Sequence, residues 1–425
     1  MTEVASTKAA RIAPNSARLP AETDHGPKQH VVMGDGSRRS FFDRLWAARP
    51  AEAGPLPVIV GVVAIWIFFQ AQNTSYLSAR NLSNLITQMA VTAILAMAVV
   101  LVLVAGEIDL SLGSVTGVTS AVLGVLLTND HWPAGAALLA ALALGLGIGL
   151  VQGAVTAYVG VPSFLVTLGG FLAWAGLQLS VIGPAGDLPV TNGTITAIGN
   201  DYLAPWVAWL MATVVVIGVG LVEVARRRSW RRAGMRGPHP WQAIARVVLL
   251  AAVLAAIVAY LNDNFGVPYL LVVMLALAAG LGWTLRRTIF GRYLYAVGGN
   301  AEASRRAGVP LATVRVAVLG LSGLLGGVAG IVSTSNLFAT SAGVGGSTLL
   351  LEAIAAAVIG GASLFGGRGH VYQALLGALV IASIENGLYL LGKSASTVEI
   401  ATGVILVLAV SVDAASRRRR AAAGR

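Results

Sequence analysis

Two carboxylates lie within three residues of each other in an otherwise apolar stretch of the chain. Glu107 and Asp109 stand in the segment GEIDLS, between two long apolar runs, and Ser111 ends it. Acidic side chains at membrane depth are costly and usually face a cavity or a partner, so one function would be a proton or cation site in a secondary transporter. The alternative is structural: Asp109 and Ser111 would cap the helix that follows. Because short polar side chains commonly bond to nearby backbone, we favour capping.

A second group of charged residues occupies a short polar segment between two apolar runs. Asn300 is placed to cap a helix of about two turns, and Gly308 to end it. Glu302 stands in the first turn, and Arg305 and Arg306 stand in the last. A helix this short is not stable alone in water. It carries charge without a catalytic constellation, so we expect it to dock on a soluble partner; an ordinary basic cytoplasmic loop is the alternative.

Further polar residues stand singly inside apolar segments. Glu352 opens a run that ends in a glycine-rich turn carrying Arg368. Such backbone at membrane depth needs surrounding protein or a cavity, so the turn lines a pore or lies in the cytoplasm. Glu385 and Asn386 share a later apolar segment, where we expect hydrogen bonds between helices before contact with a polar solute. The same expectation applies to three glutamines: Gln88, Gln152 and Gln178.

The composition indicates which elements must hold these residues. Of the 425 residues, 56% are hydrophobic and 11% are charged, whereas a soluble domain carries about 25% charged residues. Repeated apolar runs approaching about 20 residues indicate helices that cross a membrane. The sequence therefore predicts an all-α, polytopic membrane protein. It contains no cysteine, and its five histidines lack metal-ligand spacing, so disulfides and thiolate or histidine metal sites are excluded.

Twelve apolar segments are candidate helices. They lie at about 55–71, 85–105, 111–128, 134–159, 163–182, 203–224, 243–261, 267–285, 314–333, 349–365, 371–391 and 397–412. Gly145, Gly149 and Gly153 in the fourth segment, and Gly326 and Gly330 in the ninth, have the spacing that lets helix backbones approach closely. We expect packing within one bundle rather than a dedicated dimerisation face.

The net charge of +11 is unevenly distributed along the chain. Of the 29 Lys and Arg, 27 fall in the two tails and in three loops that share one side of the membrane if there are twelve spans. The positive-inside rule then places the N- and C-termini in the cytoplasm. The basic residues orient the protein, and we expect no nucleic-acid partner.

The same patterns divide the chain into regions. Residues 1–54 are a predicted disordered cytoplasmic tail, 55–413 a transmembrane domain and 414–425 a basic cytoplasmic tail. Within the transmembrane domain, 225–242 is a basic cytoplasmic linker, and 286–313 is a cytoplasmic loop that carries the short charged helix.

One motif match is discounted. The segment from Gly387 to Ser394 fits the phosphate-binding pattern GxxxxGK[ST]. A functional loop of this kind follows a strand and opens a helix. Here the intervening residues are bulky and apolar, and the match ends a membrane helix on the predicted outer face. We therefore expect this chain to bind no cofactor, so the energy for any transport comes from a separate chain or an ion gradient.

Together these segments resemble the permease subunit of ribose/xylose-type ABC sugar importers. The stretches that carry the resemblance are GEIDLSLGS (106–114), VPSFLVTLGG (161–170), GRYLYAVGGNAEASRRAGV (291–309) and LEAIAAAVIGGASLFGGRG (351–369). Within the family the chain is most similar to the xylose permeases, with Glu107 where ribose permeases typically have glycine. Residues 203–261 form an apparent extra helix pair beside a core of roughly ten helices. Glu352, where aspartate is expected, and Glu385 are departures that preserve charge.

The resemblance implies a mechanism. Two permease copies would form a pathway through the bacterial inner membrane, among its lipids. An extracytoplasmic sugar-binding protein would deliver the sugar, and a cytoplasmic ATPase would dock below and hydrolyse ATP. Asn300–Ala307 would be the coupling helix, contacting the ATPase through Glu302, Arg305 and Arg306. Glu107 and Asp109 would have a structural or gating role, and this chain would not itself be an enzyme.

Three other functions stay open at this point. A proton-coupled sugar symporter would use Glu107, Asp109, Glu352 or Glu385 as its proton site. The same ABC mechanism would also serve another pentose, a nucleoside or an autoinducer. A membrane enzyme is the most distant alternative, because no nucleophile–base pair or metal set is visible in the sequence.

Overall fold

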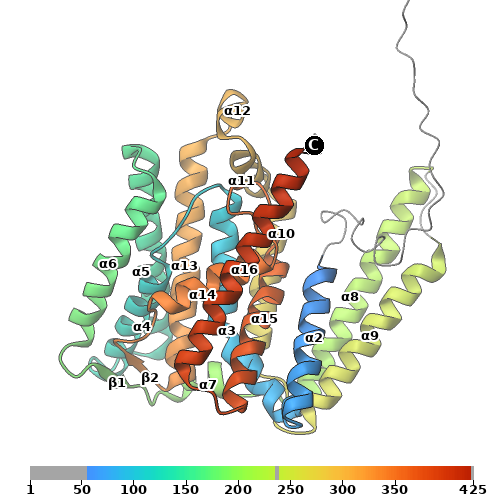
Figure 1. The fold of residues 1–425 in the computed structure, drawn as a ribbon, viewed down its shortest axis with the longest axis horizontal. Coiled ribbons are helices and arrows are strands. Elements are labelled where there is room, and N and C mark those ends of the chain that lie inside the picture. The colour runs from blue at the N-terminus through green and yellow to red at the C-terminus, as the bar shows by residue number, and fades with distance from the viewer. Residues whose placement is uncertain (1–54, 235–238, 423–425) are drawn as a thin grey trace, which may run out of the picture. The chain divides into compact units, whose positions relative to one another are not determined.

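The computed structural model describes residues 55–234 and 239–422, which are almost entirely helical (Figure 1). The helices are α2 Leu56–Gln72, α3 Ala79–Val104, α4 Leu112–Thr128, α5 Ala134–Ala154, α6 Ser163–Ile182, α7 Gly193–Asn200, α8 Pro205–Arg232, α9 Pro240–Asn262, α10 Tyr269–Arg287, α11 Ile289–Gly299, α12 Ala301–Arg306, α13 Leu311–Leu337, α14 Ser347–Ile359, α15 Val371–Leu390 and α16 Ala395–Ala422. A π-helical turn, η1 Val155–Val159, extends α5. The predicted tail at 1–54 lies outside the described residues.

Each of the twelve predicted apolar segments contains a helix. Among the described residues, eight helices are long and apolar enough to cross a membrane: α3, α5 with η1, α6, α8, α9, α10, α13 and α15. The apolar helices α2, α4 and α14, and the apolar part of α16, are shorter. The class of helical, polytopic membrane protein is therefore confirmed, while the number of complete crossings and the cytoplasmic placement of the termini stay predictions.

The described residues depart from helical structure in one short pair of strands, which leaves the predicted all-α class in place. Strand β1, Asp187–Pro189, pairs antiparallel with β2, Ala339–Ser341, so that Leu188 faces Thr340. The two strands also bring the segment after α6 beside the segment after α13. The sequence did not indicate them because a three-residue strand is too short for an alternating pattern to register.

Three predicted boundaries are corrected. Helix α8 continues to Arg232, so the predicted linker at 225–242 begins as helix, and α16 continues to Ala422 through most of the predicted tail at 414–425. Arginine and alanine are good helix formers, so polarity alone does not end a helix. The predicted apolar segment 349–365 is helical only to Ile359, because Gly360 and Gly361 follow and Gly361 takes a φ of +88°.

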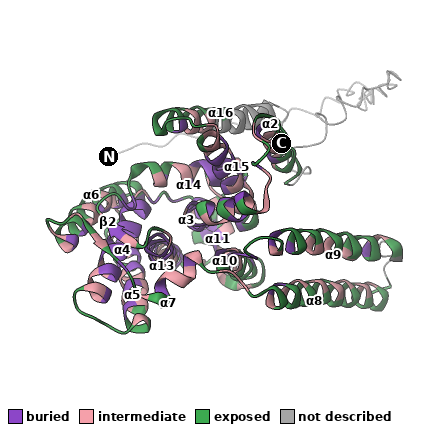
Figure 2. Ribbon diagram, turned by 90° about the horizontal axis from the view of Figure 1, so that it is seen from below, coloured by how far each residue is buried: buried purple, intermediate pink, exposed green. Residues whose placement is uncertain are grey.

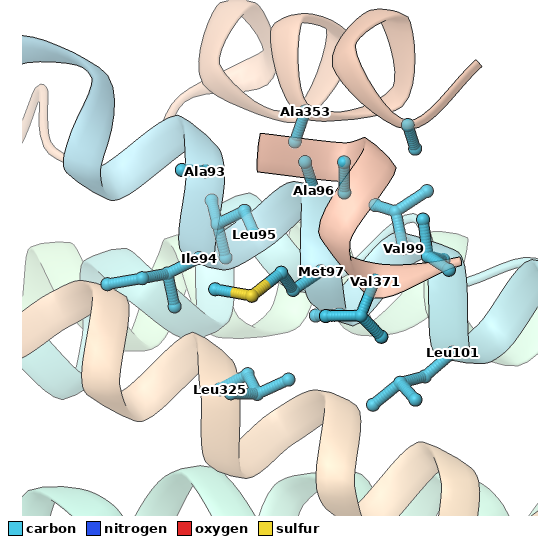
Figure 3. Close-up of a cluster of buried hydrophobic side chains, with 14 of the residues drawn as sticks. Ala93, Ile94, Leu95, Ala96, Met97, Val99, Leu101, Leu325, Ala353 and Val371 are labelled. Carbon is cyan, nitrogen blue, oxygen red and sulfur yellow. The ribbon is translucent and has the colours of Figure 1, made fainter. Parts of the chain in front are cut away.

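The core of the bundle lies around α3 and α13. Every residue of α3 from Thr92 to Val104 is buried. Met97 of α3, Leu325 of α13, Ala353 of α14 and Val371 of α15 belong to one buried cluster (Figure 3). A helix that is buried on all sides packs against several neighbours. Helix α3 therefore provides the support for the loop that follows it and for the site residues in that loop.

Glycines bring α13 into backbone contact with two helices. A Cβ on Gly153 of α5 would lie 2.8 Å from Cα of Val316, and one on Gly326 would lie 2.9 Å from the side chain of Val115 of α4. Gly145 and Gly149 meet the backbone of α13, and Gly330 meets α4, in the same way. The glycine spacing therefore serves packing within one bundle, as predicted.

Helices α8 and α9 pack against each other and form a hairpin beside the bundle (Figure 2). Few residues of either helix are buried. A small cluster that includes Ala208, Val258 and Leu261 joins their ends to Leu82 and Leu271 of the bundle. Apolar helices exposed in this way have surfaces that match lipid.

Candidate functional site

The short charged helix predicted around Asn300 is present as α12, at the opposite end of the bundle from β1 and β2 (Figure 1). The Asn300 side chain accepts a hydrogen bond from the Ala303 N–H at 2.9 Å, which is the predicted N-cap. Gly308 follows with a φ of +81°, and its N–H donates to the Arg305 carbonyl at 3.0 Å. The caps at both ends explain how a six-residue helix holds its shape.

The charges of α12 are paired with one another on an exposed surface. Glu302 Oε2 lies 2.8 Å from a terminal nitrogen of Arg305, and Oε1 accepts from Arg306 Nε at 3.0 Å. These hydrogen bonds hold the pKa of Glu302 below its usual range. The side chains of Arg305 and Arg306 are 67% and 79% exposed. Two guanidinium groups thus stand at the tip of the bundle with most of their surface available to a partner.

Helix α11, which precedes α12, is not among the predicted helices. Thr288 caps α11 by accepting from the Gly291 N–H at 3.2 Å, and Leu294 and Val297 anchor it in the core. The Tyr295 hydroxyl donates to the Gly369 carbonyl at 2.7 Å. The signal was available, since apolar residues recur at helical spacing in the segment IFGRYLYAV, but the whole segment was taken as loop.

Three glycine-containing segments meet beneath α12. Gly298 at the end of α11 lies against the Val104 carbonyl of α3 and beside Gly106 and Gly366. The Gly367 N–H donates to the same Val104 carbonyl at 3.0 Å. The end of α11, just before α12, therefore packs on the end of the buried helix α3 and on the turn after α14. The glycine-rich turn with Arg368 lies at the α12 end of the bundle.

Glu107, Asp109 and Ser111 lie in the loop between α3 and α4, held by hydroxyls of α6. The Ile108 N–H donates to Ser163 Oγ at 3.2 Å, and the Leu110 N–H donates to Thr167 Oγ1 at 3.0 Å. Because the two anchored residues alternate with the two carboxylates, Glu107 and Asp109 are directed into the protein, with exposed fractions of 8% and 6%.

The capping expectation for this loop is only half right. Ser111 occupies the N-cap position of α4, but its side chain makes no capping hydrogen bond. Asp109 Oδ1 instead accepts from the Ser111 N–H at 2.9 Å, and Oδ2 accepts from the Ser322 hydroxyl of α13 at 2.8 Å. The carboxylate thus ties the loop to a neighbouring helix, because one of its two oxygens serves the local turn and the other accepts from a distant donor.

Glu352, Glu385 and Asn386 lie elsewhere, between α3, α14, α15 and α16. Glu352 accepts from Thr92 at 3.3 Å, and Glu385 accepts from Thr402 at 3.5 Å. The Asn386 amide exchanges hydrogen bonds with Asn81 at 2.8 Å and 3.2 Å and donates to Gln88 at 3.0 Å. The structure therefore separates these residues from α12 and gives them contacts between helices, as expected for polar groups at membrane depth.

Arg315 is a site residue that the sequence did not single out. Its Nε lies 2.6 Å from Oε1 of Glu107, so the two side chains form an ion pair. The angle at the nitrogen does not meet the geometry of a hydrogen bond. In the sequence, Arg315 stood out only as one of the basic residues on the predicted cytoplasmic side. Among the described residues, no group of three His, Asp or Glu is arranged to hold a metal ion.

The structure is a helical bundle with eight described helices long enough to cross a membrane and a charged helix at one end, and comparison with known proteins identifies its class as a transport permease. Residues 81–410 match the family described as the permease component of the branched-chain amino acid transport system. The chain belongs to this family.

Several curated relatives are sugar permeases. The xylose transport system permease protein XylH of Haemophilus influenzae is 36% identical over 85% of this chain and 96% of the relative. The ribose import permease protein RbsC of Escherichia coli K12 is 31% identical over 89% of this chain and 97% of the relative. The fructose import permease protein FrcC of Rhizobium meliloti is 26% identical over 90% of this chain and 91% of the relative. No solved structure matches the chain.

The resemblance drawn from the sequence is therefore confirmed: this is a permease of the ribose/xylose type within the ABC sugar transporters. It is a multi-pass protein of the bacterial inner membrane. The particular roles assigned to its polar residues stay predictions.

Proposed function

We propose that the chain is the permease subunit of an ATP-driven importer of D-xylose. A sugar-binding protein delivers the sugar at the β1–β2 end, and a cytoplasmic ATPase docks at the α12 end. A second copy of the chain completes the pathway, and this chain binds no cofactor of its own. The observation that carries the proposal is α12: a rigid, doubly capped helix with two exposed arginines, mounted on the ends of core helices.

The contacts of α12 support a role in transmitting movement. A docking element is useful only if its displacement reaches the pathway, and four residues separate the end of α12 from the start of α13. It also follows α11, which rests on α3 through Gly298. Bundles of packed helices respond to displacement at one end as rigid bodies that rotate or slide. Nucleotide-driven closure of the ATPase would in this way shift α3 and α13 together.

The identity with XylH supports xylose as cargo, and the matches to RbsC and FrcC keep other monosaccharides as the alternative. A proton-coupled mechanism has less support. Asp109 accepts hydrogen bonds from three donors on Ser111 and Ser322, which gives this carboxylate a structural role between the loop and α13.

The test is uptake of labelled D-xylose by cells that lack only this gene, with and without the gene restored. Gene-dependent uptake that persists with a protonophore while ATP is maintained, and that stops with vanadate, supports an ATPase-driven xylose importer. Loss with the protonophore at unchanged ATP would establish a symporter instead. Gene-dependent uptake of ribose or another pentose but not of xylose would keep the mechanism and change the cargo.

A further inference from the structure

Helix α8 ends in a run of arginines that continues beyond the apolar part of the helix. Five arginines stand between residues 226 and 232, and Arg246 follows near the start of α9. Glu223 is the only acidic residue of 205–262, and this stretch contains no lysine. The arginine-bearing ends of α8 and α9 lie at the same end of the bundle as α12 (Figure 1). The positive-inside rule accounts for basic residues here, but not for the way in which they are arranged.

The length of α8 sets the depth of its arginines in the membrane. The helix has 28 residues and is about 42 Å long at about 1.5 Å per residue. The hydrocarbon core of a bilayer is about 30 Å thick, which takes about 20 residues. Residues 205–222 carry no charge, and Trp206 begins this stretch as an interfacial residue. Arg226 therefore stands where hydrocarbon gives way to headgroups, and Arg231 and Arg232 stand more than one turn further out.

Two arginines from different helices meet at this depth. A terminal nitrogen of Arg226 lies 3.6 Å from Glu223 Oε1, and one of Arg246 lies 3.7 Å from the same oxygen. Both distances are beyond hydrogen-bond range, so the guanidinium groups keep N–H donors for another acceptor. The two arginine side chains are 55% and 63% exposed, whereas that of Glu223 is 16% exposed. One carboxylate against two guanidinium groups leaves an accessible positive charge.

Neighbouring contacts fix the position of this arginine pair. The guanidinium of Arg226 lies over the ring of Trp230, 5.4 Å from its centroid. The Arg227 side chain donates to the His239 carbonyl at 3.1 Å, which ties the end of α8 to the start of α9. A guanidinium that stacks on an aromatic ring still presents its planar edge, and that edge matches two oxygens of a phosphate. The pair is therefore arranged for a phosphate group that lies between the two helices.

Exposed apolar side chains continue from the arginines toward the middle of both helices. Leu221 and Val222 lie before the arginines of α8, and Val248 and Leu249 follow Arg246 on α9; all four are exposed. A ligand that matches the whole surface has a phosphate at one end and hydrocarbon chains at the other. A free phosphate would use only the cations, and an acidic soluble protein would place its own surface against apolar side chains at membrane depth.

We propose that Arg226 and Arg246 form a binding site for an anionic phospholipid, whose phosphate lies between the two guanidinium groups. Its acyl chains lie along the exposed apolar surface of α8 and α9. A lipid with net negative charge is selected over a zwitterionic one, because the choline of phosphatidylcholine cancels the charge that the arginines attract. The bound lipid holds the hairpin, which lies beside the bundle (Figure 2), at a fixed depth in the membrane. This site does not depend on which sugar the protein carries.

The test titrates the full-length protein in detergent with phosphatidylglycerol or phosphatidylcholine and counts bound lipids by native mass spectrometry. The parent should bind phosphatidylglycerol about tenfold more tightly than phosphatidylcholine. Replacing Arg226→Gln and Arg246→Gln together should weaken phosphatidylglycerol binding about tenfold or more. The matched control, Arg231→Gln with Arg232→Gln, removes the same charge from the same hairpin and should change the affinity less than about twofold.

A second variant keeps the charge of the pair. Replacing Arg226→Lys and Arg246→Lys retains both cations and removes the planar edge, so affinity for phosphatidylglycerol should fall about threefold. Melting temperatures in lipid-free detergent check that every variant is folded. If the glutamine variant does not fold, the lysine variant decides, and parent-like affinity in it would overturn the paired geometry.

Three other results would overturn the site. Equal affinity of the parent and R226Q/R246Q for phosphatidylglycerol would show that the pair does not bind the lipid. Equal losses in R226Q/R246Q and R231Q/R232Q would reduce the effect to the net charge of the hairpin. Displacement of phosphatidylglycerol by ammonium phosphate, at an ionic strength where ammonium acetate leaves it bound, would assign the arginines to a free anion instead of a lipid.

Discussion

Arg315 Nε lies 2.6 Å from Oε1 of Glu107, which joins the first turns of α13 to the loop that follows α3. The side chain of Glu107 is 10% exposed and that of Arg315 is 34% exposed, so the pair is screened less than a surface pair. Both residues lie close to elements that carry α12: α13 follows it in sequence, and Gly106 lies beside Gly298 of α11. The pair is therefore placed where movement of the docking helix would strain or release it.

We expect the two charges to be coupled in stability. Glu107→Gln and Arg315→Gln should each lower the apparent melting temperature of the purified protein, because each leaves one charge without its partner. The double substitution should cost less than the sum of the two single substitutions, by about 1 kcal/mol. Thermal unfolding of the four proteins in the same detergent measures this. Strictly additive losses would show that the pair has no energetic role.

Reversing the two exposed charges of α12 should uncouple the protein from its ATPase. With Arg305→Glu and Arg306→Glu together, we expect xylose uptake to fall about tenfold or more, since opposite charges at an interface become like charges. Membrane levels of the protein should not change, because both side chains are exposed. The matched control reverses Arg231 and Arg232, two adjacent exposed arginines at the end of α8. Equal uptake by the two double variants would reject α12 as the docking helix.

The pairing within α12 should depend on pH in one direction. The pKa of Glu302 is lowered by its hydrogen bonds to Arg305 and Arg306, relative to about 4.3 in an unfolded chain. A lowered pKa means that the stabilisation is fully present above the unfolded value and is lost as the pH falls through the folded value. Hydrogen exchange of the α12 amides, corrected for intrinsic rates, should show constant protection from pH 8 to about 5 and a decline below about 4.

The matched variant for this experiment is Glu302→Gln, which cannot ionise. Its α12 protection should be lower than that of the parent at neutral pH and should not change in the acidic range. If the parent and the variant have the same profile, the Glu302–arginine pairs contribute nothing to the helix.

Of the two glycines that end α11, Gly298 should not tolerate a side chain, whereas Gly299 should accept one. A Cβ on Gly298 would collide with the Val104 carbonyl and lie 2.8 Å from the Gly367 nitrogen, so Gly298→Ala must displace α11 from α3. A Cβ on Gly299 would have no neighbour within 4 Å. We expect G298A to lose most of its uptake and several degrees of melting temperature. G299A should behave like the parent, and equal loss in both variants would indicate a helix-propensity effect instead of a collision.

Local chemistry explains why much of the fold was predictable. An apolar run long enough to cross a membrane must be helical, since lipid offers no partner to the backbone. Each of the twelve predicted apolar segments contains a helix, and eight of the described helices are long enough to cross. The Asn300 cap and the Gly308 stop were equally predictable, because their hydrogen bonds reach only three residues along the chain. Errors arose where the helical spacing of apolar residues was overlooked within a polar segment, as in α11, or where polarity was taken to end a helix, as in α8.

The sequence by itself determined the family, the helical membrane class, the short charged helix and the set of polar residues within apolar segments. Only the tertiary structure decided which of those residues meet. It brought Glu107 to Arg315, Asp109 to Ser322, and Gly298 to Val104, and it left Glu352 and Glu385 far from α12 in another part of the bundle. The physical reason is that helix signals depend on neighbours within a few residues, whereas pairing across a bundle depends on how whole helices pack against each other.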